Sequence, residues 1–576
     1  MTNREKNGKP SGSRSSDGAS IGTCRIHASP FRVFLAHEAP VLSRSDLPRS
    51  GSFRSRADRI EGRRVDEPRP DIRQYRHRQA PGRRYAVRGT GNAARAGPAN
   101  RALTKTQRTI LKLTIVTAAL AVAGWLIAAQ PIIRPEQVRP DLHPHAPQRC
   151  LAIFVICLAL WFTNVIPLAA TGLLAIALLS GLKVLPKAEA FGLFGNDAVF
   201  FMLGVFLLAA ATISTGLSKR VTLLALHRFD RTPQRLVMGV TVSAAFLALW
   251  MPEHAVAAMM YPILIEIVTA LELPRGAPYA KKLFLGLAWG AVIGGVGTFL
   301  GGARAPLALE MLHEAHPEST IPFLKWMIAA LPVVVIMTAL ALIVLRRRIP
   351  AREQSIRPAT RMLRERVRLL GPLSARERRL AVLNVATILA WIVWGHELGL
   401  GTIAIGAAVL LFILRIAKWN ELQNYVNWGV LFMYGGAVAL GRAVTETRAM
   451  EYLARQVIDP SLPPLAIVVL MAACAIVLTE GISNSAAVAV LLPIGYSLGD
   501  LIHVGPAMMT LAVTIPAGLA FLLPVGSPPN AISFAAGHYS IRESVAIGWP
   551  MSLAGLLVLV AVIVLWWEPV LHVQTW

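Results

Sequence analysis

The chain has 576 residues, of which 54% are hydrophobic and 16% are charged. Long apolar runs in so weakly charged a chain exclude a soluble globular protein and predict an all-α polytopic membrane protein. The net charge of +26 resembles that of nucleic-acid-binding proteins, but most of it lies in two stretches outside the apolar runs. We therefore expect the protein to lie in a lipid bilayer and to have no nucleic-acid partner. The four cysteines have no paired spacing, which indicates neither a disulfide framework nor a metal site.

Residues 1–104 are rich in Arg, Ser, Gly and Pro and show no sustained apolar periodicity. Residues 1–108 hold 24 basic and 9 acidic side chains, a net charge of +15. Such a segment cannot bury enough apolar surface to fold alone, so we predict a disordered basic cytoplasmic tail. Because Arg-rich tracts attract phosphates, one interpretation is a lipid- or nucleic-acid-binding arm. We favour the simpler interpretation of a dispensable extension.

The first membrane half is predicted at residues 105–345, with the first repeat at about 151–345. Its elements, in chain order, are spans at 109–129, 151–169, 171–184 and 198–217, re-entrant hairpin arms at 236–250 and 255–269, a broken span at 283–311 and a span at 321–345. Residues 346–379 form a basic linker, with 12 basic and 3 acidic side chains between Arg346 and Leu380. Excess Lys and Arg mark the cytoplasmic side, so we expect the linker and the N-terminus there.

The second membrane half is predicted at residues 380–576 and repeats this scheme. Its spans lie at 380–394, 401–416 and 428–444, followed by a second hairpin around 475–495, a broken span at 508–537 and a last span at 547–567. The total is about eleven transmembrane helices and two re-entrant hairpins. Since the two halves enter the membrane from opposite sides, the predicted fold is an inverted-repeat transporter.

An internal repeat supports this arrangement. Met251–Ile263 aligns without gaps on Ile482–Ile494, which pairs Pro262 with Pro493. The same offset also pairs Phe201 with Phe432 and Thr171 with Thr402, and one shared offset over so long a span is hard to obtain by chance. We therefore expect two halves of one fold.

Small polar residues interrupt two apolar runs of the second half. Gly481 and the residues up to Ser485 read as a hairpin tip, where the second arm points free N–H groups at a small anion. At 526–530, two prolines remove backbone donors and leave carbonyls that suit a cation. The alternative is that these residues act only as helix caps or turns. We favour binding, with substrate contacts from Ser483, Asn484, Ser485, Ser527 and Pro528 and ion coupling through Gly526 and Asn530.

These motifs resemble those of the divalent anion/sodium symporters, whose hairpin tips bear Ser-Asn-Thr and whose broken helices bear Thr-Pro-Pro-Asn. The second copies here are Ser483-Asn484-Ser485 and Ser527-Pro528-Pro529-Asn530, and the first copies are Pro252-Glu253-His254 and Gly302-Ala303-Arg304-Ala305. The resemblance covers about residues 151–567. It implies sodium-coupled transport of dicarboxylates, citrate or sulfate, an elevator mechanism and a homodimer.

Glu253, His254 and Arg304 are the main departures from that pattern, because charges deep in lipid are costly unless they are paired or face a cavity. In one hypothesis, Arg304 replaces a bound cation and orients the first tip through a bidentate contact with Glu253. In a second, Glu253 or His254 binds a proton that is coupled to anion movement. In a third, the charges form an inert salt bridge. Arg304 is also a candidate substrate contact, and Thr298 is a candidate ion-coupling residue.

The predicted function is secondary active transport of a small anion, of the dicarboxylate, tricarboxylate or sulfate type, with altered or reduced sodium coupling. Sodium or a proton would be the coupling ion, and the sequence indicates no other cofactor. A cation/proton antiporter of related architecture is the alternative, because such a protein needs a lone buried acid. An intramembrane enzyme is disfavoured, since the chain has no His-Glu-x-x-His spacing for a metal hydrolase and we expect no Gly-x-Ser-x-Gly turn.

Deletion of residues 1–100 should leave transport per folded molecule unchanged, because the segment precedes every predicted span and has no core of its own. Uptake into proteoliposomes by the truncated and full-length proteins, normalised to the folded fraction, measures this. Loss of transport by a well-expressed truncated protein would show that the tail acts in regulation or assembly.

Overall fold

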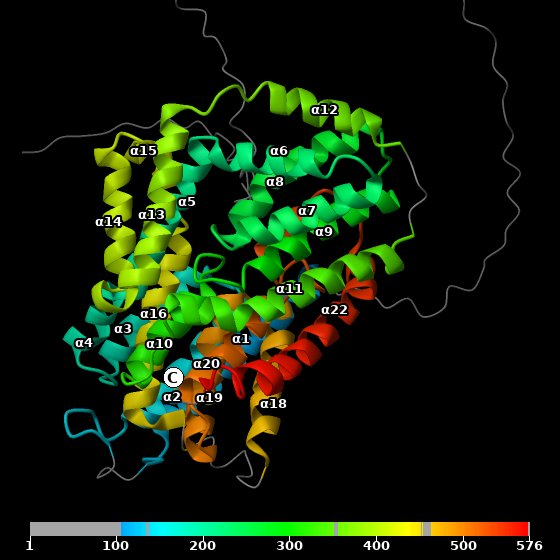
Figure 1. The fold of residues 1–576 in the computed structure, drawn as a ribbon. Helices are drawn as coiled ribbons and strands as arrows, with labels where there is room; N and C mark the ends of the chain where they lie inside the picture. The colour runs from blue at the N-terminus through cyan, green and yellow to red at the C-terminus, as the bar shows by residue number, and fades with distance from the viewer. Residues whose placement is uncertain (1–104, 134–137, 351–354, 451, 453–461, 574–576) are drawn as a thin grey trace, which may run out of the picture. The chain divides into compact units, whose positions relative to one another are not determined.

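The computed structural model describes residues 105–133, 138–350, 355–450, 452 and 462–573 (Figure 1). All regular elements within these ranges are helical, which confirms the predicted all-α class. Nine of the described helices are long and apolar enough to cross a membrane, judged by length and composition. The count of eleven spans and the re-entrant course of the hairpins stay predictions. The predicted tail at 1–104 lies outside the described residues.

We assign the described helices to the two predicted halves and to the predicted linker between them. Those of the first half are α1 (Lys105–Ala128), α2 (Ala146–Thr163), α3 (Leu168–Gly181), α4 (Lys187–Gly192), α5 (Asp197–Ser214), α6 (Leu217–Arg228), α7 (Pro233–Ala248), α8 (Glu253–Ala270), α9 (Pro278–Gly294), α10 (Arg304–Ala315) and α11 (Phe323–Arg348). The linker holds α12 (Arg357–Arg368). Those of the second half are α13 (Ala375–Leu398), α14 (Leu400–Ile413), α15 (Trp419–Leu422), α16 (Trp428–Thr447), α18 (Pro464–Gly481), α19 (Asn484–Ile502), α20 (Pro506–Thr514), α21 (Pro528–Phe534) and α22 (Ile541–Val562).

The repeat in the sequence is also a repeat of structure. A shift of 231 residues carries α7 onto 464–479 and α8 onto 484–501, and the chain has α18 and α19 at these places. The same shift carries α3 onto α14 and α5 onto α16. The helix boundaries thus follow the same offset of 231 residues as the sequence.

Helices of opposite halves pack closely in two symmetry-related pairs, α3 with α16 and α5 with α14. Gly172 of α3 lies so near α16 that a Cβ atom there would be 2.5 Å from the carbonyl oxygen of Phe432. A Cβ atom on Gly204 of α5 would be 2.6 Å from the backbone of Ala404 in α14. Glycine thus lets the helix backbones approach each other, as small residues do where membrane helices pack.

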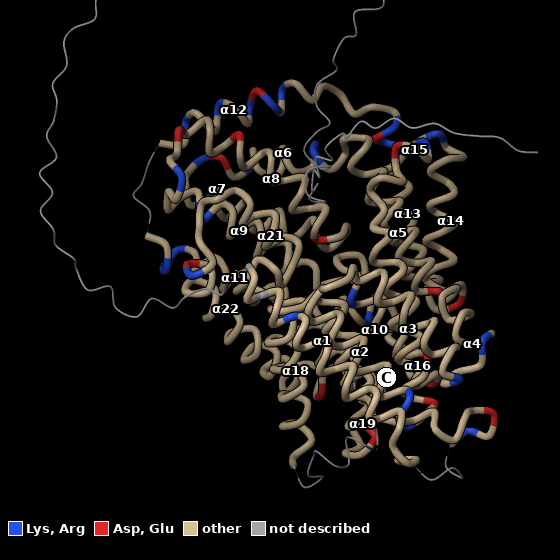
Figure 2. Tube along the Cα trace, turned by 180° about the vertical axis from the view of Figure 1, so that it is seen from behind, with Lys and Arg blue, Asp and Glu red and all other residues tan. Residues whose placement is uncertain are grey.

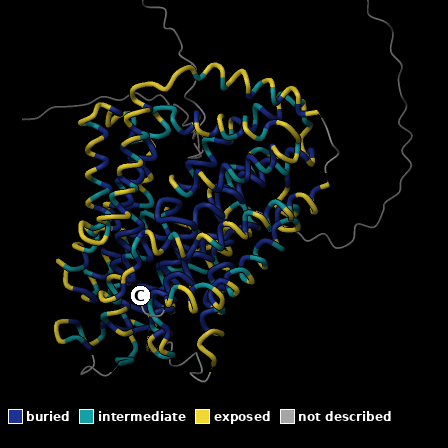
Figure 3. Tube along the Cα trace, viewed as in Figure 1, coloured by how far each residue is buried: buried dark blue, intermediate teal, exposed yellow. Residues whose placement is uncertain are grey.

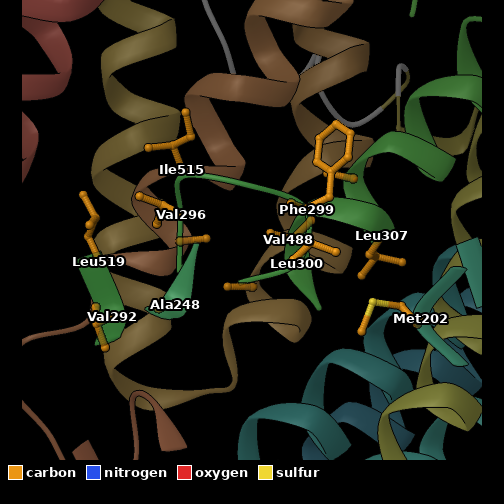
Figure 4. Close-up of a cluster of buried hydrophobic side chains, with 14 of the residues drawn as sticks. Met202, Ala248, Val292, Val296, Phe299, Leu300, Leu307, Val488, Ile515 and Leu519 are labelled. Carbon is orange, nitrogen blue, oxygen red and sulfur yellow. The ribbon is translucent and has the colours of Figure 1, made fainter. Parts of the chain in front are cut away.

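Both broken spans unwind at the centre of the molecule. In the first half, residues 295–303 separate α9 from α10. In the second, α20 leads through the short 3-10 turn η5 (Pro516–Gly518) to an unwound segment that ends at Ser527. Apolar side chains of the two segments, among them Phe299 and Leu519, belong to one buried cluster (Figure 4).

The prolines of the second break lie elsewhere than expected. Pro528 and Pro529 are the first residues of α21, whose N-cap Ser527 accepts a hydrogen bond from the backbone N–H of Asn530. Proline suits this position because its missing N–H would have no partner in the helix anyway. The interruption precedes the prolines, at residues 519–526.

The basic linker contains a helix that the sequence pattern did not predict. In Figure 1, α12 lies across α6 and α8, and Thr360 of α12 donates to the carbonyl of Asp230. Arg220 of α6 donates to Glu377 and to the carbonyls of Leu370 and Gly371, which holds the end of the linker. In Figure 2, charged residues gather toward the helix ends. In Figure 3, α13 and α14 contain long exposed stretches, and their exposed residues include the apolar Val382, Leu389, Val409 and Ile413. This distribution fits a protein surrounded by lipid.

Gly172→Ala should destabilise the protein by about 1–3 kcal/mol, because the added methyl group would meet the backbone of α16 and not a movable side chain. Gly181→Ala, in the same helix but with no atom within 4 Å, is the matched control. Thermal unfolding in detergent should show a lower midpoint for Gly172→Ala alone. Equal midpoints for both variants would contradict the close packing of α3 and α16.

Candidate functional site

A buried arginine occupies the centre of the first broken span. Arg304 begins α10 and is 2% exposed, and its Nη1 donates to Oε2 of Glu253 at 3.2 Å. A side chain on Gly302 or Gly518 would collide with its guanidinium group, so glycine at both positions makes room for the charge. Nη2 has no hydrogen-bond partner among the described residues. The ion pair required by the first and third hypotheses is present, with a single contact instead of the bidentate contact of the first hypothesis.

Glu253 links the tips of the two halves. It begins α8, is 4% exposed, and its backbone N–H donates to the carbonyl of Gly301 at 2.8 Å. Oε1 of its carboxylate accepts a hydrogen bond from Nδ2 of Asn484 at 3.3 Å. Asn484 is the residue that the 231-residue offset pairs with Glu253, so the repeat-related residues of the two tips touch each other. The carboxylate thereby bridges Arg304 and Asn484.

The second tip is held from its other side by Thr479. Its Oγ1 lies 2.7 Å from Oδ1 of Asn484 and 2.7 Å from the carbonyl oxygen of Ala517. Ser483 caps α19 by accepting from the backbone N–H of Ala486 at 3.2 Å. Ser485 is buried beside them. Of the three predicted tip residues, Asn484 is the one that joins the buried polar network.

The second break is a closed set of hydrogen bonds around Glu480. Its carboxylate accepts from the backbone N–H groups of Phe521, Leu522 and Leu523 at 2.7, 3.0 and 2.9 Å. Nδ2 of Asn530 donates to the carbonyls of Ala520 and Leu523 at 3.0 and 3.4 Å. The carbonyls that we expected to face a cation are thus partly used by Asn530. We assigned no role to Glu480, although an acid directly before a predicted tip was a usable signal.

The remaining predicted site residues differ in their burial and in their contacts. Gly526 packs against the carbonyl of Thr479, and Pro528 is exposed. Thr298 donates to the carbonyl of Leu249 at 2.6 Å, which fixes the turn of the first tip. The rings of His254 and Phe206 pack in an edge-to-face arrangement, with their centroids 6.2 Å apart.

The predicted residues therefore form two neighbouring groups. Glu253, Arg304 and Asn484 make up the first, and Gly526, Ser527 and Asn530 lie around Glu480 in the second. The two groups adjoin because Thr479, which contacts Asn484, directly precedes Glu480 in the chain.

Comparison with known proteins decides the family. Residues 116–573 match the family described as the sodium:sulfate symporter transmembrane region. The chain belongs to this family. It is 30% identical over 455 residues to the sodium-dependent dicarboxylate transporter SdcS of Staphylococcus saprophyticus, covering 73% of this chain and 87% of that one. It is 29% identical over 442 residues to SdcS of Staphylococcus aureus strain NCTC 8325, covering 72% and 84%.

Among solved structures, the chain is similar to the YdaH transporter of Alcanivorax borkumensis, with a TM-score of 0.48 and 15% identity. That likeness covers 72% of this chain and 98% of the other.

Membership in the family confirms the predicted resemblance and makes the chain an integral, multi-pass secondary transporter of small anions. The family consists of transporters and not of enzymes, as expected. The spacing Gly-x-Ser-x-Gly does occur at Gly495–Gly499, but it lies inside α19, where Ser497 donates to the carbonyl of Pro493. A hydrolase needs that motif at a strand-to-helix turn.

Proposed function

We propose that this transporter carries a small dianion, of the dicarboxylate class or with similar oxyanion chemistry such as citrate or sulfate, bound between the second tip and Arg304. The observation that carries the proposal is the unpaired Nη2 of Arg304, a buried cationic donor whose partner Glu253 contacts Asn484 at the start of α19. A buried donor without a partner is costly, and a carboxylate or sulfate oxygen would satisfy it. The relatives named for dicarboxylate transport support the substrate class.

The hydrogen bonds of the buried acids weigh against a cation/proton antiporter. Such a protein needs a carboxylate whose oxygens are open to a metal cation, which demands more room than the uptake of a proton. Glu253 is engaged by Arg304 and Asn484, and Glu480 by three backbone N–H groups. Arg304 keeps one donor, Nη2, without a partner among the described residues, and a buried cationic donor of this kind favours an anion.

Sodium coupling should be reduced in this transporter. Arg304 places a fixed positive charge where the family pattern has a Thr-Pro-Pro-Asn motif, and a like charge a few ångströms away opposes sodium entry. Ser527, Asn530 and Gly526 remain as oxygen-bearing candidates for one sodium site near the second break. Glu253, His254 and Thr298 are the ion-coupling candidates of the first half. We propose that they do not form a second sodium site.

The transport cycle that we propose is of the elevator type. The two repeats would exchange conformations and so expose the site alternately on each side. We further propose a homodimer, with the N-terminus and the Arg-rich linker in the cytoplasm, since positive charge beside membrane spans is retained inside.

Asn484→Ala should abolish most anion transport while the protein remains folded, because it removes the amide that lies between Glu253 and Thr479. Uptake of radiolabelled succinate, citrate and sulfate into proteoliposomes measures this. Asn420→Ala, the same change at an exposed position of α15, is the matched control. Transport by Asn484→Ala at the rate of the wild type would refute the assignment of the second tip.

Anion transport should be sodium-independent or depend on sodium with a Hill coefficient of about one, since at most one sodium site survives beside Arg304. Arg304→Ala should lose activity or change its ion dependence, because breaking a buried pair by removing one partner typically costs about 3–5 kcal/mol. Arg361→Ala, on the exposed face of α12, is the control. Steeply cooperative sodium dependence, together with an Arg304→Ala variant that behaves as wild type, would leave the pair as an inert salt bridge.

A further inference from the structure

The hydroxyl group of Thr479 lies between two acceptors but has a single hydrogen. Its Oγ1 is 2.7 Å from the carbonyl oxygen of Ala517 and 2.7 Å from the amide of Asn484, and the side chain is fully buried. When the amide oxygen of Asn484 faces Thr479, both neighbours compete for one hydrogen. When the amide nitrogen faces Thr479, it donates to Oγ1 and the hydroxyl group donates to Ala517. The two ends of an amide have the same shape, so a rotation of the side chain interchanges these arrangements.

The orientation of the Asn484 amide determines whether Glu253 must accept or donate a hydrogen bond. The other end of the amide is 3.3 Å from Oε1 of Glu253. If the nitrogen is there, an ionised Glu253 accepts from it. If the oxygen is there, two acceptors face each other unless Oε1 bears a proton. Protonated Glu253 therefore permits an unbroken chain of donors from Glu253 through Asn484 and Thr479 to Ala517, whereas ionised Glu253 leaves one acceptor beside Thr479 without a hydrogen.

Charge balance at Arg304 connects these two arrangements to the substrate. In the empty site, the guanidinium group is balanced by ionised Glu253, whose Oε2 is 3.2 Å from Nη1. An anion that binds the unpaired Nη2 adds negative charge to buried surroundings, where uncompensated charge is costly. If Glu253 becomes neutral, Arg304 balances the anion instead.

We propose that Glu253 takes up one proton when the anion binds and that Asn484 turns its amide with that proton. The proton enters with the anion from one side of the membrane and leaves with it on the other, so the transporter is a proton–anion symporter. This inference rests on the proposed function and specifies its coupling ion. The proton on Glu253 takes the place of one coupling cation.

Within the described residues, Arg304 is the charged side chain recorded against Glu253. His254 faces Phe206, and Glu480 binds the backbone of residues 521–523. Three of the helices packed against α8 bring no titratable side chain near Glu253. The helix α21 has no titratable residue, and the titratable residues of α7 and α9 lie at the N-terminal ends of these helices, a helix length away from the first tip. In α6 and α12, Arg220 binds Glu377 and Arg366 binds Glu266, at the linker end.

Calorimetric titration of succinate into the purified full-length protein tests the proposal. The titration is done at constant sodium concentration and about pH 8. Succinate is fully ionised there, since carboxylic acids titrate at about pH 4. Repeating the titration in buffers with different enthalpies of ionisation gives the number of protons taken up per bound anion. We expect about one proton, and an affinity that falls by up to about tenfold per pH unit as pH rises, because the bound state holds one more proton than the empty state.

Glu253→Gln keeps the shape of the carboxyl group but cannot gain a proton, so its proton count should be near zero and its affinity independent of pH. Glu266→Gln, the same change at the acid of α8 that binds Arg366 near the linker, should still take up about one proton. A count near zero in the wild type, or of one in Glu253→Gln, would overturn the proposal. If Glu253→Gln does not fold, the count and pH dependence of the wild type decide. Failure of succinate, citrate and sulfate alike to bind would instead contradict the proposed function.

Discussion

The ion pair between Arg304 and Glu253 is the constraint on which the centre of this protein depends. Two charges that are 2% and 4% exposed must be paired or neutralised, because hydration is no longer available to them. The surroundings accommodate them: glycines at 302 and 518 leave room for the guanidinium group, and glycine at 295 leaves room for the carboxylate. The pair also fixes where the halves meet, since Glu253 begins α8 and accepts from Asn484 at the start of α19.

The unwound segments obey the same rule for the backbone. A membrane interior offers no water, so each peptide group released by a broken helix needs a partner within the protein. Glu480 supplies the acceptors for three N–H groups, and Asn530 supplies donors for two carbonyls. Thr298 does the equivalent for the turn after α7. Residues that a sequence pattern marks as binding groups are thus also what allows the helices to be broken at this depth.

Much of the fold was predictable from hydropathy and the internal repeat, because both depend on the order of residues along the chain. The offset of 231 residues was found from residues such as Pro262 and Pro493, and it reappears in the boundaries of α7, α8, α18 and α19. The pairing of Arg304 with Glu253 was part of two of the three open hypotheses, because two opposite charges in apolar runs need each other.

The features that were missed depend on three-dimensional approach. The contact of Glu253 with Asn484 follows only once the two tips are known to meet, and Glu480 looked like an isolated acid until the break was placed at residues 519–526. The two prolines were misread because proline both ends one helix and begins the next, and periodicity does not distinguish these cases. The helix α12 was missed because its abundant charge resembles that of a linker.

The asymmetry of the two halves also limits how transport can be driven. A sodium ion that enters with the substrate on one side and leaves on the other transfers the free energy of its gradient to the substrate. Arg304 can neutralise the same substrate charge, but it never dissociates, so it balances charge without drawing on any gradient. Replacing a bound cation by a positively charged side chain therefore preserves the binding of the anion and removes one co-transported ion per cycle. Any accumulation of the anion must then be driven by an ion that does leave, at Glu253 or beside Ser527 and Asn530, or by exchange for another anion. Because the Arg304–Glu253 pair is neutral when the site is empty, it also adds no net charge to the movement of the empty site through the membrane field.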